Sequence, residues 1–238
     1  MAFLNLLYED SVRINDNIRV MIPDVGTVLS HEEDYYRLVS VLTAMPYDMM
    51  VQLDDIGIDF TEIDDYDLFL LLFPGLKTEN TELLFGDLDL SQFVTEINQK
   101  NGTVMLRDPG TGIVIDRAIF TRIANTLREI HHLEKTVKKP GNEDAKKYLL
   151  ERTRKKLKRM KSRKSKSELQ SLIVAMVNSS EFKYDYETVK KISIYQFNQS
   201  VHQIINKTDW SNRMHGVYAG TVDAKRLTED EMSWIPRT

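Results

Sequence analysis

The chain has 238 residues, 42% of them hydrophobic and 29% charged, which is ordinary for a globular protein with one large domain or two small ones. It contains no cysteine, which excludes disulfides and thiolate metal sites. The net charge is −4, but acidic and basic residues are distributed unevenly along the chain. Residues 1–100 carry 20 acids and 5 bases, residues 101–170 carry 8 acids and 19 bases, and residues 171–238 carry 8 of each.

The first predicted elements are short and separated by turn signals. Residues 18–29 hold two apolar runs around a Pro-Asp pair, which is typical of a small hairpin or of a strand followed by a turn. Ser30 and Glu33 form a capping box that predicts the start of a helix. The apolar run 68–73 predicts another helix that stops at Pro74, and this run is far too short to span a bilayer.

Residues 82–115 are the most strand-like part of the chain. The link from Arg107 to Gly112 is a strong turn signal, so the sequence predicts a β-hairpin here. We interpret its glycines as turn residues and not as a phosphate-binding loop, because no Lys-Ser or Lys-Thr pair follows them. Asp116 is predicted to cap the next helix.

The rest of the chain predicts helices. Residues 143–160 are good helix formers with only a narrow apolar stripe. Capping boxes that begin at Ser165 and Ser193 predict two further helices, and residues 209–218 predict a separate short one.

These elements together predict an α+β protein that is predominantly α-helical, with small β-hairpins in the N-terminal half and a helical C-terminal half. The charge pattern divides the chain into an acidic mixed part (1–134), a basic helical connector (135–167) and a helical C-terminal part (168–238). The sequence leaves open whether the two outer parts form separate cores.

The basic segment 135–166 holds 15 of the 32 Lys and Arg residues. One interpretation is a solvated helix that pairs with the acidic N-terminal part of the chain or with an acidic partner. The alternative is a sequence-independent contact with nucleic-acid phosphates. The candidate partner-binding residues are Lys146, Lys147, Arg152, Arg154, Lys155, Lys156, Lys158, Arg159, Lys161, Arg163 and Lys164.

No pattern in the sequence predicts a catalytic or metal site. The carboxylates between Asp54 and Asp67 are dense, but their spacing lacks the glycine and the closing Glu of a calcium loop. His131 and His132 lie near a predicted helix end, where a polar or cationic side chain suits the helix dipole. We therefore predict no catalytic residue, no cofactor and no metal, and expect a protein that is not an enzyme.

The segment 216–223 combines small and aromatic residues and predicts a tight turn near the end of the chain. Tyr218 and Trp234 are the candidate aromatic anchors for a partner, because an amphipathic ring buries a large area on contact.

Several stretches also resemble a family of proteins from tailed bacteriophages and prophages of Gram-positive bacteria. They are residues 35–40, 46–48, 53–60, 182–186, 194–198 and 216–221, together with Trp234-Ile235.

The resemblance covers most of the chain and implies a role in phage morphogenesis, as a tail-assembly chaperone or a minor virion component. It implies other phage structural proteins as partners, no membrane partner, and a location in the host cytoplasm or in the virion. The sorted charge adds the expectation that the chain self-associates, with the acidic part of one copy against the basic helix of another.

Overall fold

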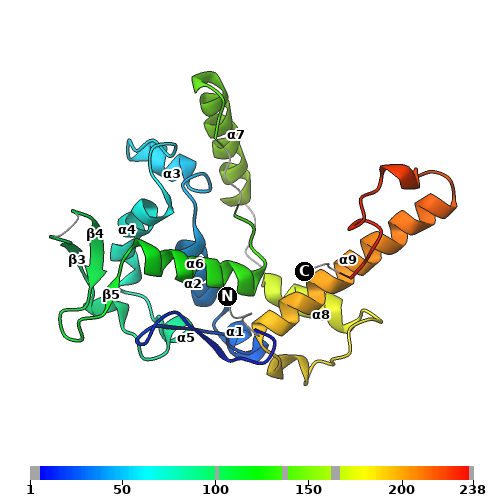
Figure 1. The fold of residues 1–238 in the computed structure, drawn as a ribbon, viewed down its shortest axis with the longest axis horizontal. Coiled ribbons are helices and arrows are strands. Elements are labelled where there is room, and N and C mark those ends of the chain that lie inside the picture. The colour runs from blue at the N-terminus through cyan, green and yellow to red at the C-terminus, as the bar shows by residue number, and fades with distance from the viewer. Residues whose placement is uncertain (1–5, 100–101, 136–138, 162–166, 236–238) are drawn as a thin grey trace.

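The computed structural model describes residues 6–99, 102–135, 139–161 and 167–235 (Figure 1). Helices make up 53% of it and strands 8%, with two small antiparallel sheets in the N-terminal half and helices in the C-terminal half. The predicted fold class, a mostly helical α+β protein, is therefore confirmed.

The elements follow one another in this order: β1 (Ser11–Arg13), β2 (Arg19–Met21), α1 (Val25–Ser30), α2 (Glu32–Thr43), α3 (Met50–Asp55), α4 (Asp65–Leu76), α5 (Glu82–Phe85), η1 (Leu90–Gln92), β3 (Val94–Ile97), β4 (Val104–Arg107), β5 (Val114–Ile115), α6 (Arg117–His131), α7 (Glu143–Lys161), α8 (Glu168–Val177), η2 (Val189–Lys191), α9 (Ile194–Tyr218) and η3 (Ala224–Arg226).

The first apolar run of the predicted N-terminal hairpin is a strand, but the second is the helix α1. Asp24 starts this helix by accepting a hydrogen bond from the backbone N–H of Thr27 at 2.6 Å. Ser30 does not cap the next helix as predicted, because it lies in the last turn of α1 and its hydroxyl donates to the carbonyl of Gly26 at 2.9 Å. The helix α2 begins only after His31.

The second sheet confirms the predicted β-hairpin. Its strand order is β3-β4-β5, and all pairs are antiparallel. Asp108 closes the turn between β4 and β5 by donating its backbone N–H to the carbonyl of Ile113 at 2.9 Å. Gly112 supplies the positive φ of 74° that the turn requires. The hydroxyl of Tyr66 on α4 lies 3.1 Å from the carbonyl oxygen of Ile115, which fastens the sheet to the helices.

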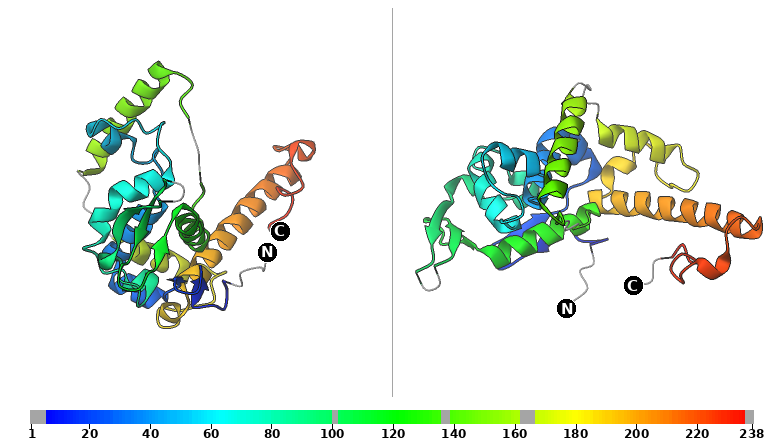
Figure 2. Two further views of the ribbon diagram at one scale, coloured as in Figure 1. Left: turned by 60° about the vertical axis from the view of Figure 1, so that its left-hand side comes forward. Right: turned by 90° about the horizontal axis from the view of Figure 1, so that it is seen from above.

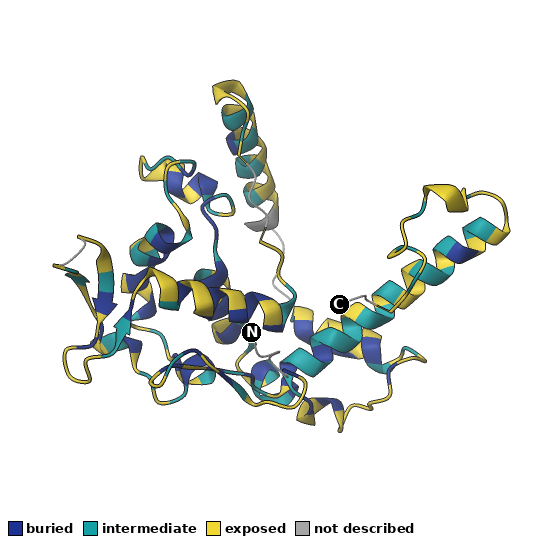
Figure 3. Ribbon diagram, in the orientation of Figure 1, coloured by how far each residue is buried: buried dark blue, intermediate teal, exposed yellow. Residues whose placement is uncertain are grey.

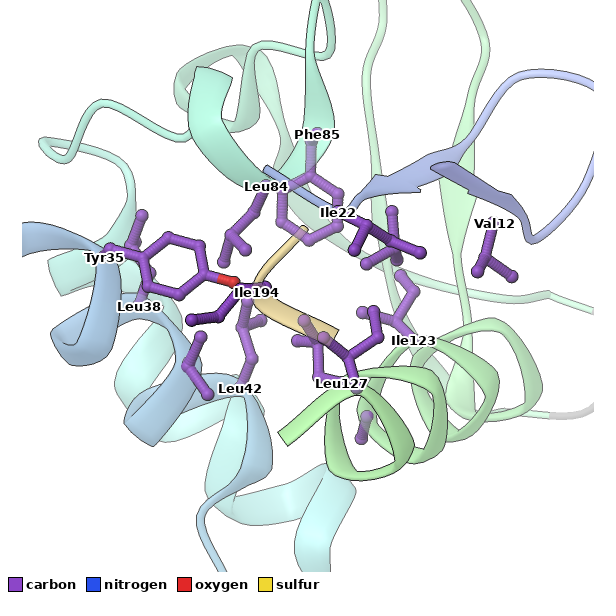
Figure 4. Close-up of a cluster of buried hydrophobic side chains, with 14 of the residues drawn as sticks. Val12, Ile22, Tyr35, Leu38, Leu42, Leu84, Phe85, Ile123, Leu127 and Ile194 are labelled. Atoms are coloured by element: carbon purple, nitrogen blue, oxygen red, sulfur yellow. The ribbon is translucent and has the colours of Figure 1, made fainter. Parts of the chain in front are cut away.

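The main hydrophobic core lies where the β1–β2 hairpin, α2, α5, α6 and the first turn of α9 converge (Figure 4). Phe69 of α4 and Phe120 of α6 stack with their ring centroids 4.3 Å apart. Ile194 and Phe197, at the start of α9, are completely buried. A single core therefore contains side chains from both the N-terminal and the C-terminal halves of the chain.

A second, smaller apolar cluster joins α3, α4 and α7. Its buried members are Met50, Val51, Leu53, Phe60, Leu68 and Leu150. Only Leu150 comes from α7, so this long helix is attached to the body along one narrow line of contact.

The helix α9 runs unbroken for 25 residues, so the prediction of a separate helix at 209–218 was wrong. No glycine or proline interrupts residues 194–215, and the hydroxyl of Thr208 donates to the carbonyl of Ile204 within the helix. Its distal half projects away from the body (Figure 2). Beyond the first turn, Met214 is the one residue of α9 that is buried among those the structure describes (Figure 3).

Because the first turn of α9 holds the fully buried residues that attach it, while Val201 and Ile204 pack only partly against the core, we expect Phe197→Ala to lower the free energy of unfolding by about 3–5 kcal/mol, as for other buried phenylalanines. Equilibrium unfolding in urea measures the change. The matched control is Ile205→Ala on the distal half of the same helix, where the side chain is 53% exposed and the loss should stay within about 0.5 kcal/mol. Equal losses for both variants would contradict this account of how α9 is attached.

Candidate docking surfaces

The inner face of α7 forms ion pairs with acidic residues around α3. The guanidinium of Arg154 reaches the carboxylates of Asp54 and Asp55, each at 2.6 Å. About two turns nearer the start of the helix, the ammonium of Lys146 contacts Asp59. The interpretation that the basic segment pairs with the acidic N-terminal part of the same chain is confirmed for these two cations.

Asp59 is the most strongly perturbed of these carboxylates. The hydrogen bond from Lys146 and those from the backbone and hydroxyl of Thr61 lower the pKa of Asp59 to about 2. Asp59 is therefore ionised at neutral and mildly acidic pH, where it can pair with Lys146.

Apolar contacts reinforce the inner face. Leu150 is buried in the small cluster, and Leu149 and Leu157 pack against it while remaining partly exposed. Leu149, Leu150 and Leu157 thus form the line along which α7 meets the body, whereas Tyr148, which the sequence also placed in the apolar stripe, lies on the opposite face.

The outer face of α7 presents the remaining cations to solvent. Its exposed cationic residues are Lys147, Arg152, Lys155, Lys156, Lys158 and Arg159. In the described parts of the chain, the first five of these form no ion pair. Tyr148 lies among them with 64% of its surface exposed. The side chain of Lys161 and the whole of Arg163 and Lys164 fall outside the described residues.

The other acidic residues of this region serve as caps and ion-pair partners. Asp64 caps α4 through a complete capping box and also contacts Arg117. Asp65 lies 2.7 Å from Lys135 and 3.4 Å from the buried Arg128. Within the described residues, no group of three or more His, Asp or Glu side chains could hold a metal ion.

The C-terminal tail folds back along the distal half of α9. The indole N–H of Trp210 donates to the carbonyl of Met232 at 3.0 Å, and the amide of Gln203 donates to the carbonyl of Trp234 at 3.0 Å. A side chain at Gly216 would place its Cβ 2.7 Å from Val222, so the turn closes tightly against the helix only because this residue is glycine. We call α9 beyond residue 203, together with residues 219–235, the C-terminal arm.

The two predicted anchors differ in their surroundings on this arm. Tyr218 is 84% exposed at the end of α9, whereas Trp234 is 37% exposed and has the ammonium of Lys207 5.9 Å from its ring centroid. Tyr218 is therefore the freer contact, and Trp234 also secures the tail. Sequence reasoning missed Trp210, because nothing local shows that its N–H meets a backbone carbonyl 22 residues later.

Histidines from two distant segments meet where α6 packs on α9. His131 places Nε2 3.0 Å from the hydroxyl oxygen of Tyr35. His132 ends α6 in the left-handed conformation, at φ 52°, and stacks on His202 with centroids 5.2 Å apart. Tyr195 stacks against the same imidazole at 5.9 Å. The structure thus brings together three histidines that form no set in the sequence.

His131 lies in the last turn of α6, as expected, but burial removes its charge. Burial, helped by the neighbouring His132, lowers the pKa of His131 to about 4. Burial and His202 likewise lower the pKa of His132. These rings act as neutral packing groups at neutral pH.

Comparison with models of protein families finds a match over residues 160–238, to the YomV second domain. The matched stretch contains α8, η2, α9 and η3, and therefore the whole C-terminal arm. This similarity suggests a phage-associated family. No curated protein and no solved structure matches the chain. In the part of the chain that the structure describes, no helix has the length and apolar character to cross a membrane.

We expect Leu150→Ala to release α7 from the body, at a cost of about 2–3 kcal/mol in docking free energy for a buried leucine. Hydrogen exchange of the α7 amides measures this release. Arg154→Ala should have a smaller effect, because Arg154, Asp54 and Asp55 are 37%, 47% and 55% exposed and water screens the pairs. Arg152→Ala, on the outer face, is the control and should change nothing. A larger effect for Arg154→Ala than for Leu150→Ala would show that charge, and not burial, holds the helix.

We also expect the protein to lose stability as the pH falls from about 6.5 to about 4. The folded state keeps His131 neutral down to about pH 4, while the unfolded chain takes up a proton near pH 6.5. Neutral His131 makes its full contribution to the free energy of unfolding above pH 6.5. The loss of this contribution reaches about 3 kcal/mol near pH 4. Urea unfolding across this range measures it.

The variant His131→Gln keeps a hydrogen-bonding side chain that does not titrate, so its stability should fall less over the same range. The exposed His31→Gln serves as the control and should retain the dependence of the unmodified protein. Identical pH profiles for His131→Gln and the unmodified protein would contradict the assignment.

Proposed function

We propose that this chain is a non-enzymatic phage morphogenesis protein, a tail-assembly chaperone or a virion structural component, that acts by docking to other phage structural proteins. The observation that carries the proposal is the C-terminal arm. It projects from the core (Figure 2), and it carries exposed aromatic and aliphatic side chains, namely Ile205, Tyr218, Trp234 and Ile235. An extended helical element of this kind is suited to contact with another protein.

The arm has the features of a prearranged binding element. An isolated helix of this length is marginally stable in water, so the folded-back tail supplies the packing that keeps it helical. Met214 is buried beneath the tail, and the side chain of Arg213 donates to the carbonyl of Glu231 at 2.9 Å. Because the arm is already ordered, a partner would not have to supply the free energy of ordering it.

The exposed side chains at its surface are the proposed contact residues. Tyr218, Trp234 and Ile235 are exposed by 84%, 37% and 59%. Aromatic residues of this kind dominate the binding energy of many interfaces. The match to the YomV second domain supports the proposal, because it covers the same arm and links this stretch to a phage-associated family.

The places taken by the polar side chains support a non-enzymatic role. The carboxylates near α3 and α4 are engaged as helix caps and as partners of Lys and Arg. The histidines of the α6–α9 junction pack against aromatic rings. These groups stabilise the fold, which leaves the surface for binding.

Charge is proposed to orient the encounter. Opposite charges on separate parts of one molecule steer partners and set their register more than they add affinity. The same distribution also suits self-association of the chain, with the acidic body of one copy facing the cations of another. The proposed locations are the host cytoplasm during assembly, or the finished virion.

A tagged copy recovered from infected cells should bring phage structural proteins with it, identified by mass spectrometry. We expect Tyr218→Ala, combined with Ile235→Ala, to reduce this recovery at least tenfold without changing the melting temperature, because both side chains are exposed. Mass spectrometry of purified virions then separates a retained component from a chaperone that leaves.

The matched control is Tyr8→Ala, since Tyr8 is 82% exposed but lies on the N-terminal body. It should recover the same proteins as the unmodified chain. Recovery of no phage structural protein by the unmodified chain, at low or at high salt, would rule out the docking role. Unchanged recovery by the arm variant would rule out the arm as its site.

A further inference from the structure

The outer face of α7 is a cationic surface that the docking role of the C-terminal arm does not use. Tyr148, Arg152, Lys155 and Arg159 follow one another at spacings of four, three and four residues, so they form one stripe along the helix. Lys147, Lys156 and Lys158 lie on either side of it. From residue 147 to 159 this surface is about 18 Å long.

The fold keeps five of these cations available, namely Lys147, Arg152, Lys155, Lys156 and Lys158. Arg154 and Lys146 are engaged by the acids of the body, and these contacts turn the opposite side of α7 to solvent. The carboxylates of Asp54, Asp55 and Asp59 are therefore already paired with the inner face of α7, and Glu151 is the acid that lies among the outer cations. Figure 3 shows the exposed side of α7 standing clear of the rest of the molecule.

The composition of this face argues against a protein partner. Protein interfaces have an apolar centre and are depleted in lysine. The outer face of α7 is rich in lysine and arginine, and Tyr148 is its one large exposed hydrophobic side chain among the described residues. Cations without apolar surroundings match a backbone of phosphates, which they neutralise with release of counterions.

The position of Tyr148 favours a single-stranded over a double-stranded nucleic acid as the ligand. Its ring is 64% exposed at the N-terminal end of the cationic stripe, where an unpaired base can stack on it. A duplex offers no free base face there, and its higher charge density would be repelled more strongly by the acidic body. We propose that the outer face of α7 binds single-stranded nucleic acid without sequence preference, through its phosphates and through stacking of a base on Tyr148.

The purified full-length protein and a fluorescent oligothymidylate of about 20 nucleotides test this proposal by anisotropy titration. Five unpaired cations should give a slope of log affinity against log salt of about −3.5, which is a loss of roughly 100-fold between 50 and 200 mM salt. Changing Lys147, Arg152, Lys155, Lys156 and Lys158 to Gln should abolish the salt dependence. Tyr148→Ala should weaken binding about tenfold without changing the slope.

Two control variants test whether binding depends on the outer face of α7 itself or only on net charge and exposed aromatic rings in general. A variant with Gln at five exposed cations outside α7, namely Lys183, Lys190, Lys191, Lys225 and Arg226, has the same net charge and should bind normally. Tyr8→Ala removes an equally accessible ring elsewhere and should have no effect.

Three results would overturn the proposal. They are binding that is unaffected by the α7 changes, affinity for a duplex of the same length equal to that for the single strand, and displacement of the oligonucleotide by polyglutamate as efficiently as by unlabelled strand. The last would identify an acidic protein as the ligand. Because the test uses only purified protein and synthetic ligands, its outcome is independent of whether the C-terminal arm captures phage proteins.

Discussion

The contact between α7 and α3 determines which side of the basic helix faces solvent. The guanidinium of Arg154 spans two adjacent carboxylates, and Leu150 inserts into the small apolar cluster one turn away. Burial of the leucine supplies most of the attraction, since the ion pairs are open to water. The pairs fix the rotation of the helix about its axis. Any other rotation would turn Arg154 away from Asp54 and Asp55 and leave three charges without partners. The paired cations of α7 therefore lie on its inner face, and its unpaired cations lie on its outer face.

The two long helices, α7 and α9, are attached to the body in different ways. The first is held along one face, and the second is inserted by its first turn, where the Ser193 capping box precedes the buried Ile194 and Phe197. A helix held along its side keeps its outer face exposed, whereas a helix held at one end exposes its distal half on all sides. The tail that folds back on α9 covers part of this surface and leaves Tyr218 at the tip. The fold therefore offers two separate surfaces of different chemistry, one cationic and one aromatic.

Local signals predicted the parts of the fold that depend on neighbouring residues. The capping residues Asp116 and Ser193 were identified correctly, because a residue type that can accept from a backbone N–H three residues later is visible in the sequence. Prediction failed where two signals compete. Asp24 caps α1, so the apolar residues that follow it form a helix. The sequence favoured a strand there, because a turn signal separates these residues from the preceding apolar run.

The candidate site was predicted less completely, because its geometry depends on contacts between distant segments. The sequence identified the basic residues of α7 as a group, but it gave no means of telling Arg154, which faces Asp54, from Arg152, which faces solvent. The approach of His202 to His132, 70 positions away in the chain, follows only from the packing of α9 on α6. Trp210 was likewise missed, since its partner is a backbone carbonyl of the tail.

Separation of the two surfaces has a consequence for how the protein can act. The ends of α7 and α9 point in different directions from the common core, so occupation of one surface does not block the other sterically (Figure 1). Between them lies the junction of α6 and α9, where His131 and His132 are held neutral in a packed arrangement with Tyr35 and Tyr195. Packing at this junction fixes where α9 leaves the body, whereas α7 is fixed separately by its contact with α3. Protonation of these buried histidines at acidic pH is therefore expected to weaken the attachment of α9 to α6.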